Sequence, residues 1–133
     1  MKTVDFLKQE EFPGLLMLIK KFAETTDTAF HTHVYEVAGS LMNNNALTIV
    51  GKDDEKPFPL VAYICGYIQN PEEFIMTQAY SEDAKLTPII GDFFEEHLRS
   101  IKIKKVFTLF KHSPKLPQKY GYKIERYLMS KEL

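Results

Sequence analysis

A few side chains in this sequence could transfer a proton in a reaction. Glu72 and Glu73 follow an Asn-Pro pair, and a carboxylate there could act as a general base toward an amine. His112 follows an apolar segment, and the ordinary pKa of histidine, about 6.5, suits proton transfer near neutral pH. Each also has a structural interpretation, since paired glutamates after Asn-Pro often form a solvated turn. Glu73 and His112 are therefore candidate catalytic residues on chemical grounds alone.

A metal site is the chemistry to consider at Phe30-His31-Thr32-His33. Two histidines that stand two residues apart lie on one side of a strand but diverge on a helix. The sequence supplies no third or fourth ligand at a helical spacing. We therefore expect no metal site and a polar loop that enters a helix.

The composition excludes several classes of protein. Lys and Arg number 17 against 18 Asp and Glu, so the net charge is −1 and we expect no nucleic-acid partner. Cys65 is the single cysteine, which rules out an intramolecular disulfide, and its apolar neighbours predict a buried side chain. The apolar runs are far shorter than the roughly 20 residues of a membrane span, so we expect no membrane contact and a cytoplasmic protein. No nucleophile elbow, phosphate-binding loop or zinc-protease motif occurs.

Three helices that could position these side chains are predicted from apolar residues that recur every three or four positions. The first begins near Glu10 and ends in the turn-favouring residues 25–28, and the second covers about Thr32–Met42. The third has Thr87 as its N-cap and Pro88 as its first helical residue.

Six segments are predicted as strands from β-branched residues, apolar runs or alternation. They are Lys2–Leu7, Ala46–Gly51, Leu60–Gln69, Glu73–Tyr80, Lys105–Phe110 and Tyr122–Met129. Short turns join the second, third and fourth strands, which predicts an antiparallel meander, and a helical crossover makes the fourth and fifth strands parallel. With a turn or short helix at Pro114–Pro117, the order is β-α-α-β-β-β-α-β-α-β, a single α+β domain over residues 1–133 with a mixed sheet.

Lys119-Tyr120-Gly121-Tyr122 is similar to the Lys/Leu-Gly-Phe turn before the last strand of the Gcn5-related N-acetyltransferase (GNAT) family. The order of elements over nearly the whole chain also resembles that family. The resemblance implies a splayed, mostly antiparallel sheet with acetyl-CoA in the gap between the fourth and fifth strands. It also implies a small-molecule or peptide amine as the acyl acceptor, and a homodimer stays open.

The resemblance further implies which residues contact acetyl-CoA. In the family, main-chain groups of the fourth strand hold the pantetheine arm. The start of the crossover helix holds the diphosphate, because unpaired N–H groups and the helix dipole favour an anion there. The corresponding positions are Gln78, Ala79, Tyr80 and Ser81 in the strand, and Lys85, Leu86, Thr87 and Pro88 in the loop.

Two motifs depart from the family's pattern. The diphosphate loop of the family reads Gln/Arg-x-x-Gly-x-Gly/Ala, whereas Pro88 and Ile90 stand here in place of glycines, and Pro88 lacks an N–H. Many members carry a tyrosine that protonates the departing thiolate. Its position here is Pro117, which leaves Tyr120 as the nearest candidate.

Two functions therefore stay open. The first is an acyl-CoA-dependent N-acetyltransferase with a degenerate cofactor loop, in which a base deprotonates the amine, the amine attacks the thioester, and main-chain N–H groups stabilise the oxyanion. The second is a catalytically inactive GNAT-fold binding or structural protein, for instance in a phage particle. A closed sheet without splay would instead indicate an unrelated α+β ligand-binding domain.

Overall fold

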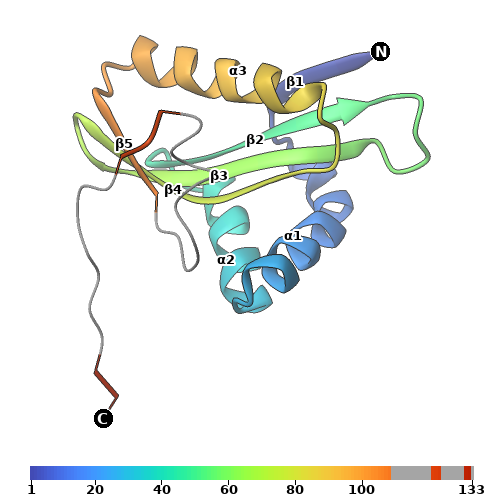
Figure 1. Cartoon of the computed structure of the whole chain (residues 1–133), viewed down its shortest axis with the longest axis horizontal. Helices are drawn as coiled ribbons and strands as arrows, with labels where there is room; N and C mark the ends of the chain where they lie inside the picture. Colours follow the sequence, from blue (N-terminus) through green and yellow to red (C-terminus); the bar gives the residue numbers. More distant parts are fainter. Residues whose placement is uncertain (109–120, 124–130, 133) are drawn as a thin grey trace.

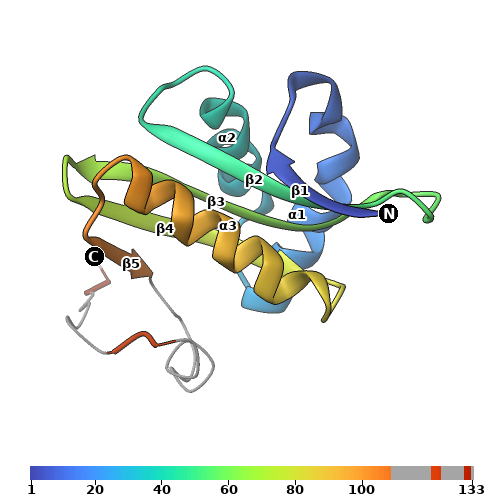
Figure 2. The same ribbon diagram turned by 90° about the horizontal axis from the view of Figure 1, so that it is seen from above.

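A five-stranded sheet with helices on both faces makes up the computed structural model, which describes residues 1–108, 121–123 and 131–132 (Figure 1). Helices α1 and α2 cover one face, and α3 covers the other (Figure 2). In chain order the elements are β1 (Lys2–Phe6), the 3-10 turn η1 (Gln9–Glu11), α1 (Phe12–Thr26), α2 (Phe30–Ser40), β2 (Ala46–Asp53), β3 (Leu60–Asn70), β4 (Glu73–Ser81), α3 (Leu86–Ser100) and β5 (Lys105–Thr108).

The strands lie side by side in the order β1-β2-β3-β4-β5. The first four pair antiparallel with their neighbours, and β5 pairs parallel to β4. Helix α3 connects these two parallel strands. The predicted meander, the crossover and the mixed α+β fold are therefore confirmed.

Two hydrophobic layers hold the helices on the sheet, because neighbouring residues of the central strands point to opposite faces and both are buried. Val50 and Tyr63 face α1 and α2, whereas Ile49 and Ile64 face α3. The layer under α1 and α2 is completed by Leu15, Leu18, Ile19 and Val37, and the layer under α3 by Phe74, Ile90, Phe94 and Leu98. Cys65 is buried at 1% exposure, as predicted.

The bounds of two helices differ from the sequence prediction. Helix α2 begins at Phe30, so the predicted loop at His31 is wrong: His31 is exposed on the helix and His33 is buried. Helix α3 begins at Leu86, so Thr87 is not its N-cap and Pro88 is not its first residue.

Some predicted features lie outside the described residues. They are His112, Tyr120, the turn at Pro114–Pro117, and the last predicted strand from position 124 onward. Gly121 has a φ of 89°, a backbone conformation that favours glycine. In the part of the chain that the structure describes, no helix is long and apolar enough to cross a membrane, and no cluster of three or more His, Cys, Asp or Glu side chains could hold a metal ion.

Candidate active site

A β-bulge interrupts β4 at Thr77. Cys65 of β3 pairs with Gln78, but the next residue, Gly66, pairs with Met76, so Thr77 is an extra residue in β4. The Thr77 hydroxyl donates a hydrogen bond of 3.2 Å to the Cys65 carbonyl oxygen. The bulge therefore takes the backbone of one residue out of the regular ladder in the middle of the sheet.

Gly66 makes this bulge possible. A Cβ atom at position 66 would lie 2.2 Å from the carbonyl oxygen of Ile75 and 2.5 Å from the ring of Phe74. No side chain fits at these distances, so the close approach of β4 to β3 requires glycine. A glycine inside an otherwise apolar strand is the sequence signal for this bulge, which the strand prediction from apolar residues alone did not include.

The bulge also reverses which face the side chains of β4 occupy, because an extra residue shifts the two-residue alternation. Before the bulge, Phe74 packs on the α3 side. After it, Gln78 and Tyr80 lie on the side of α1 and α2. The fully buried Gln78 accepts a 2.8 Å hydrogen bond from the Tyr63 hydroxyl and donates a 3.1 Å bond to the His33 carbonyl oxygen. The Gln78 side chain thus attaches α2 to the sheet.

Pairing between β4 and β5 covers the first half of β4. The paired residues run from Glu73 with Lys105 to Met76 with Thr108, and Thr108 is the last described residue of β5. The Thr108 hydroxyl donates a 3.2 Å hydrogen bond to the Met76 carbonyl oxygen at this last pair. Among the described residues, the second half of β4 pairs with β3 alone.

A cavity of about 330 Å³ lies beside the bulge, on the α2 side of the sheet. Its lining comes from α2, the turn after it, and strands β2, β3 and β4: Glu36, Gly39, Asn43, Ala46, Cys65, Gly66, Tyr67 and Thr77. Glu36 is the one charged side chain among these residues, and it is partly exposed. The cavity therefore places a carboxylate next to the bulge.

His33 lies on α2, three residues before Glu36. Its Nε2 atom is 2.6 Å from the Thr28 hydroxyl, and its ring packs edge-on against Phe22. Its Nδ1 atom is 3.8 Å from a Glu36 carboxylate oxygen and, within the described residues, has no hydrogen-bond partner. The histidine thus places a ring nitrogen close to the carboxylate of the cavity.

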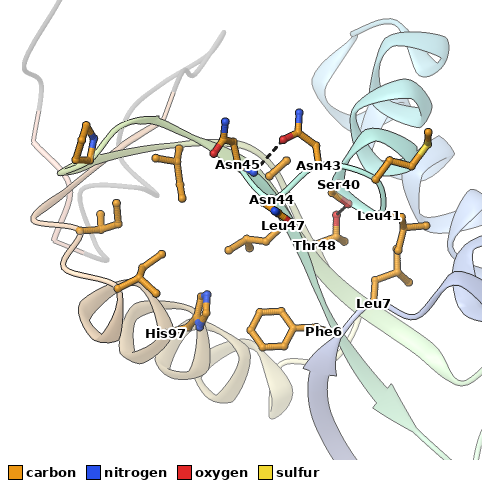
Figure 3. A pocket seen from close by; sticks show the side chains of 16 residues that line it. Phe6, Leu7, Ser40, Leu41, Asn43, Asn44, Asn45, Leu47, Thr48 and His97 are labelled. Carbon is orange, nitrogen blue, oxygen red and sulfur yellow. Dashed lines mark hydrogen bonds between the residues drawn. The ribbon is translucent and has the colours of Figure 1, made fainter.

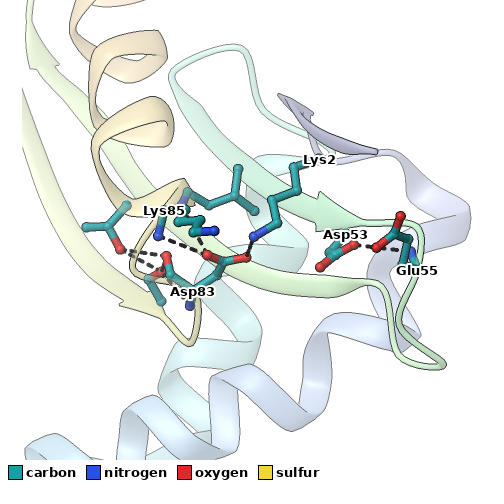
Figure 4. Close-up of polar contacts among 8 residues, drawn as sticks. Lys2, Asp53, Glu55, Asp83 and Lys85 are labelled. Atoms are coloured by element: carbon teal, nitrogen blue, oxygen red, sulfur yellow. Dashed lines mark hydrogen bonds and ion pairs between the residues drawn. The ribbon is translucent and has the colours of Figure 1, made fainter.

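Asp83 lies in the loop just before α3, where its side chain faces the first turn of the helix (Figure 4). Its Oδ1 atom accepts hydrogen bonds from the N–H groups of Lys85, at 2.9 Å, and Leu86, at 3.3 Å. Its carbonyl oxygen accepts the N–H groups of Leu86 and Thr87, both at 3.1 Å. The Lys2 ammonium lies 2.7 Å from Oδ2, and this hydrogen-bonded ion pair lowers the pKa of Asp83 and raises that of Lys2.

The sequence candidates Glu72 and Glu73 belong to the turn between β3 and β4. Glu73 accepts hydrogen bonds from the side-chain amides of Asn70 and Gln69, and Glu72 pairs with Lys104 at 3.4 Å. Neither is among the residues that line the cavity at the bulge. Glu36, which does line it, was missed because one glutamate on the polar side of a helix carries no sequence signal.

A larger cavity of about 720 Å³ lies elsewhere, between the ends of β1, α2 and α3 (Figure 3). Phe6 and His97 stand on one side of it, and Asn43, Asn44 and Asn45 on another. None of the sequence candidates that fall among the described residues lines it.

The sequence matches no family model and no curated protein. The structure, in contrast, resembles several solved acetyltransferases. An aminoglycoside N-acetyltransferase in complex with CoA aligns with a TM-score of 0.76 at 6% identity, over 99% of this chain and 95% of that chain. A ribosomal-protein-alanine N-acetyltransferase from Brucella melitensis biovar Abortus aligns with a TM-score of 0.73 at 12% identity, over 100% and 99%.

A third solved structure, a "predicted acetyltransferase" from Clostridium acetobutylicum with acetyl-CoA, aligns with a TM-score of 0.72 at 13% identity, over 99% of this chain and 96% of that chain. Structural similarity at such low sequence identity shows a shared fold, but it does not show that individual residues have the same chemical role. The described residues nevertheless form the mixed sheet and the crossover helix of a GNAT-like fold. The chain therefore has the fold of the GNAT acetyltransferases.

Proposed function

We propose that this protein is an N-acyltransferase that moves an acyl group from a thioester to an amine at the bulge of β4. The observation that carries the proposal is that the bulge at Thr77 and the carboxylate of Glu36 border one cavity. Acyl transfer needs both features. The backbone at the bulge can bind the oxygen of the thioester carbonyl, and the Glu36 carboxylate can hold and deprotonate an amine.

Glu36 and the backbone of Thr77 can together carry out the acyl transfer. The amine nitrogen attacks the thioester carbonyl carbon, a C–N bond forms, the C–S bond breaks, and the thiolate leaves. Glu36 accepts the proton of the amine, directly or through one water. The backbone of Thr77, which lies outside the regular ladder, supplies a hydrogen bond to the developing oxyanion.

The thioester donor lies along the second half of β4 in this proposal, as the resemblance to the GNAT family implies. An extended strand offers main-chain N–H and C=O groups to a pantetheine arm, whose two amides are similar in spacing and polarity to a peptide. The acceptor is an amine small enough to enter a cavity of about 330 Å³ with its cationic end toward Glu36.

The experiment is a comparison of Glu36→Gln with the wild type in an assay for free thiol, with S-acetyl-pantetheine and acetyl-CoA as donors and a panel of primary amines. Removing a general base lowers kcat by roughly 10²- to 10⁴-fold. Glu96→Gln, an exposed glutamate on α3, is the matched control and should leave the rate unchanged. Equal rates for wild type and Glu36→Gln would contradict the role of Glu36, and absence of amine-dependent thiol release with both donors would contradict the proposal.

A second candidate is the GNAT-fold protein without catalysis. The observation that favours it is the start of α3, where Asp83 holds the backbone N–H groups that would otherwise be open to a diphosphate. The same assay separates the two candidates, because a protein without catalysis releases no thiol in response to any amine.

A further inference from the structure

We propose that Asp83 selects the acyl donor by excluding a diphosphate from the start of α3, so that this protein binds its thioester through the pantetheine arm alone. This inference rests on the proposed function. It assigns a specificity-determining role to a residue that the sequence analysis did not consider.

The backbone donors at the start of α3 are already in use. A helix N-terminus binds a phosphate through N–H groups that have no partner within the helix. Here the N–H groups of Lys85, Leu86 and Thr87 all donate to Asp83. Pro88, the next residue, has no N–H. Four consecutive backbone positions thus offer no free donor to an anion.

The acidic side chains of this loop are also already paired. Two carboxylates, Glu82 and Asp83, stand in the loop between β4 and α3. Each already binds a lysine: Lys21 lies 2.6 Å from Glu82, and Lys2 lies 2.7 Å from Asp83. A diphosphate at this loop would therefore have to compete with the Asp83 carboxylate for the Lys2 ammonium and for the N–H groups of Lys85 and Leu86.

The hydroxyl groups of the loop make their hydrogen bonds within the loop itself. The Thr87 hydroxyl donates to the Ser81 oxygen at 2.8 Å and lies 3.0 Å from the Asp83 carbonyl oxygen. The Ser81 oxygen in turn accepts the N–H of Asp83 at 3.2 Å. A phosphate would have to break several of these bonds at once, which is costly in a buried position; Asp83 is 8% exposed.

A thioester donor without a nucleotide does not reach this loop. The pantetheine arm ends before the position of the diphosphate, so Asp83 leaves it unaffected. The expected donor class is therefore an acylated pantetheine that lacks the adenosine diphosphate portion of CoA, and that portion should add no affinity here.

The experiment compares the affinities of CoA and pantetheine for the wild type and for the double variant Asp83→Ala/Pro88→Gly, by calorimetry. The wild type should bind CoA and pantetheine with dissociation constants within about threefold. The double variant gains a backbone N–H at position 88, frees the N–H of Lys85, and releases the Lys2 ammonium. It should bind CoA at least tenfold more tightly than the wild type does, with no change for pantetheine.

Asp92→Ala is the matched control, because it removes one exposed carboxylate from the same helix without freeing an N–H group at its start. It should leave the ratio of affinities unchanged. If the double variant does not fold, Asp83→Asn keeps a side-chain acceptor for the cap but removes the charge, and a smaller gain in CoA affinity is expected.

Three results would overturn the inference. They are a wild type that binds CoA at least tenfold more tightly than pantetheine, a folded double variant without gain for CoA, and a wild type that binds neither ligand. The proposed function fails by a different result, the absence of amine-dependent thiol release with both donors, so the two failures are distinguishable.

Discussion

At the scale of single residues, Gly66 and Gln78 determine the shape of the proposed site. Gly66 allows β4 to approach β3 closely at the bulge, and Gln78 joins the sheet to α2. Both act through stability and position, so their replacement should change the free energy of unfolding.

Gly66→Ala should destabilise the protein by about 1–3 kcal/mol, because the new Cβ would overlap the Ile75 carbonyl oxygen and the Phe74 ring. The measurement is equilibrium unfolding in urea. Gly91→Ala is the control, since no atom lies within 4 Å of a Cβ at that position of α3, and alanine there should stabilise the helix by up to about 1 kcal/mol. Similar effects of the two changes would show that position 66 is not crowded.

Gln78→Leu should destabilise the protein by about 2–4 kcal/mol. The Tyr63 hydroxyl and the His33 carbonyl oxygen would each lose a hydrogen-bond partner in a buried position. Gln69→Leu, an exposed position on β3, should change the stability by less than about 0.5 kcal/mol. The two unfolding curves in urea give the comparison. A Gln78 variant as stable as the wild type would contradict the role of this side chain in holding α2.

The sequence predicted little of the site at this scale. Its candidates Gln78, Ala79, Tyr80 and Ser81 do lie in β4, but the role of these residues stays a prediction. Glu36 could not be found, because only the packing of α2 against the sheet brings its carboxylate to the bulge. Asp83 was missed for a similar reason, since its function as a cap depends on where the loop before α3 turns.

At the scale of elements, the contact between Lys2 of β1 and Asp83 before α3 joins two distant parts of the sequence. The folded-state pKa of Asp83 is lowered, so its contribution to stability is complete above the ordinary value of 3.8 and disappears as the pH falls through the lowered value. The pKa of Lys2 is raised above 10.5, so its contribution is complete below that pH and disappears only at more alkaline pH.

A double-mutant cycle with Lys2→Met and Asp83→Asn should therefore give a favourable coupling energy at pH 7 that decreases as the pH falls below about 3.8. Urea unfolding at pH 7 and pH 3 supplies the four free energies at each pH. The coupling energy at pH 7 should be small, since Lys2 is partly exposed and solvent screens the ion pair. Coupling that is absent at pH 7, or that increases toward pH 3, would contradict the ion pair.

The elements themselves were largely predictable. Apolar periodicity in α1 and the alternation or continuous apolar runs of β2, β3 and β4 locate those segments because burial requires the pattern. The start of α3 was not predictable in the same way. Thr87 and Pro88 match the statistical preferences of a helix start, yet α3 begins at Leu86, after a turn in which the Asp83 carboxylate accepts the N–H groups of Lys85 and Leu86.

At the scale of the whole molecule, the sheet order, the crossover helix and the two layers of helices are those of the GNAT acetyltransferase fold. The centre of the sheet has a bulge beside a cavity that contains a carboxylate. The start of α3, in contrast, is closed by the chain's own carboxylate. On this combination rest the proposed acyl transfer and the proposed donor that lacks the nucleotide part of CoA.

The most direct measurement is a competition between two donors, read by mass spectrometry of the acylated amine. The protein receives equal concentrations of ¹³C-acetyl-pantetheine and unlabelled acetyl-CoA, together with a mixture of primary amines. We predict an acetylated amine in which the ¹³C label is at least as abundant as the unlabelled acetyl group, and its loss in Glu36→Gln. No acetylated amine from either donor, or a product taken almost entirely from acetyl-CoA, would contradict this account.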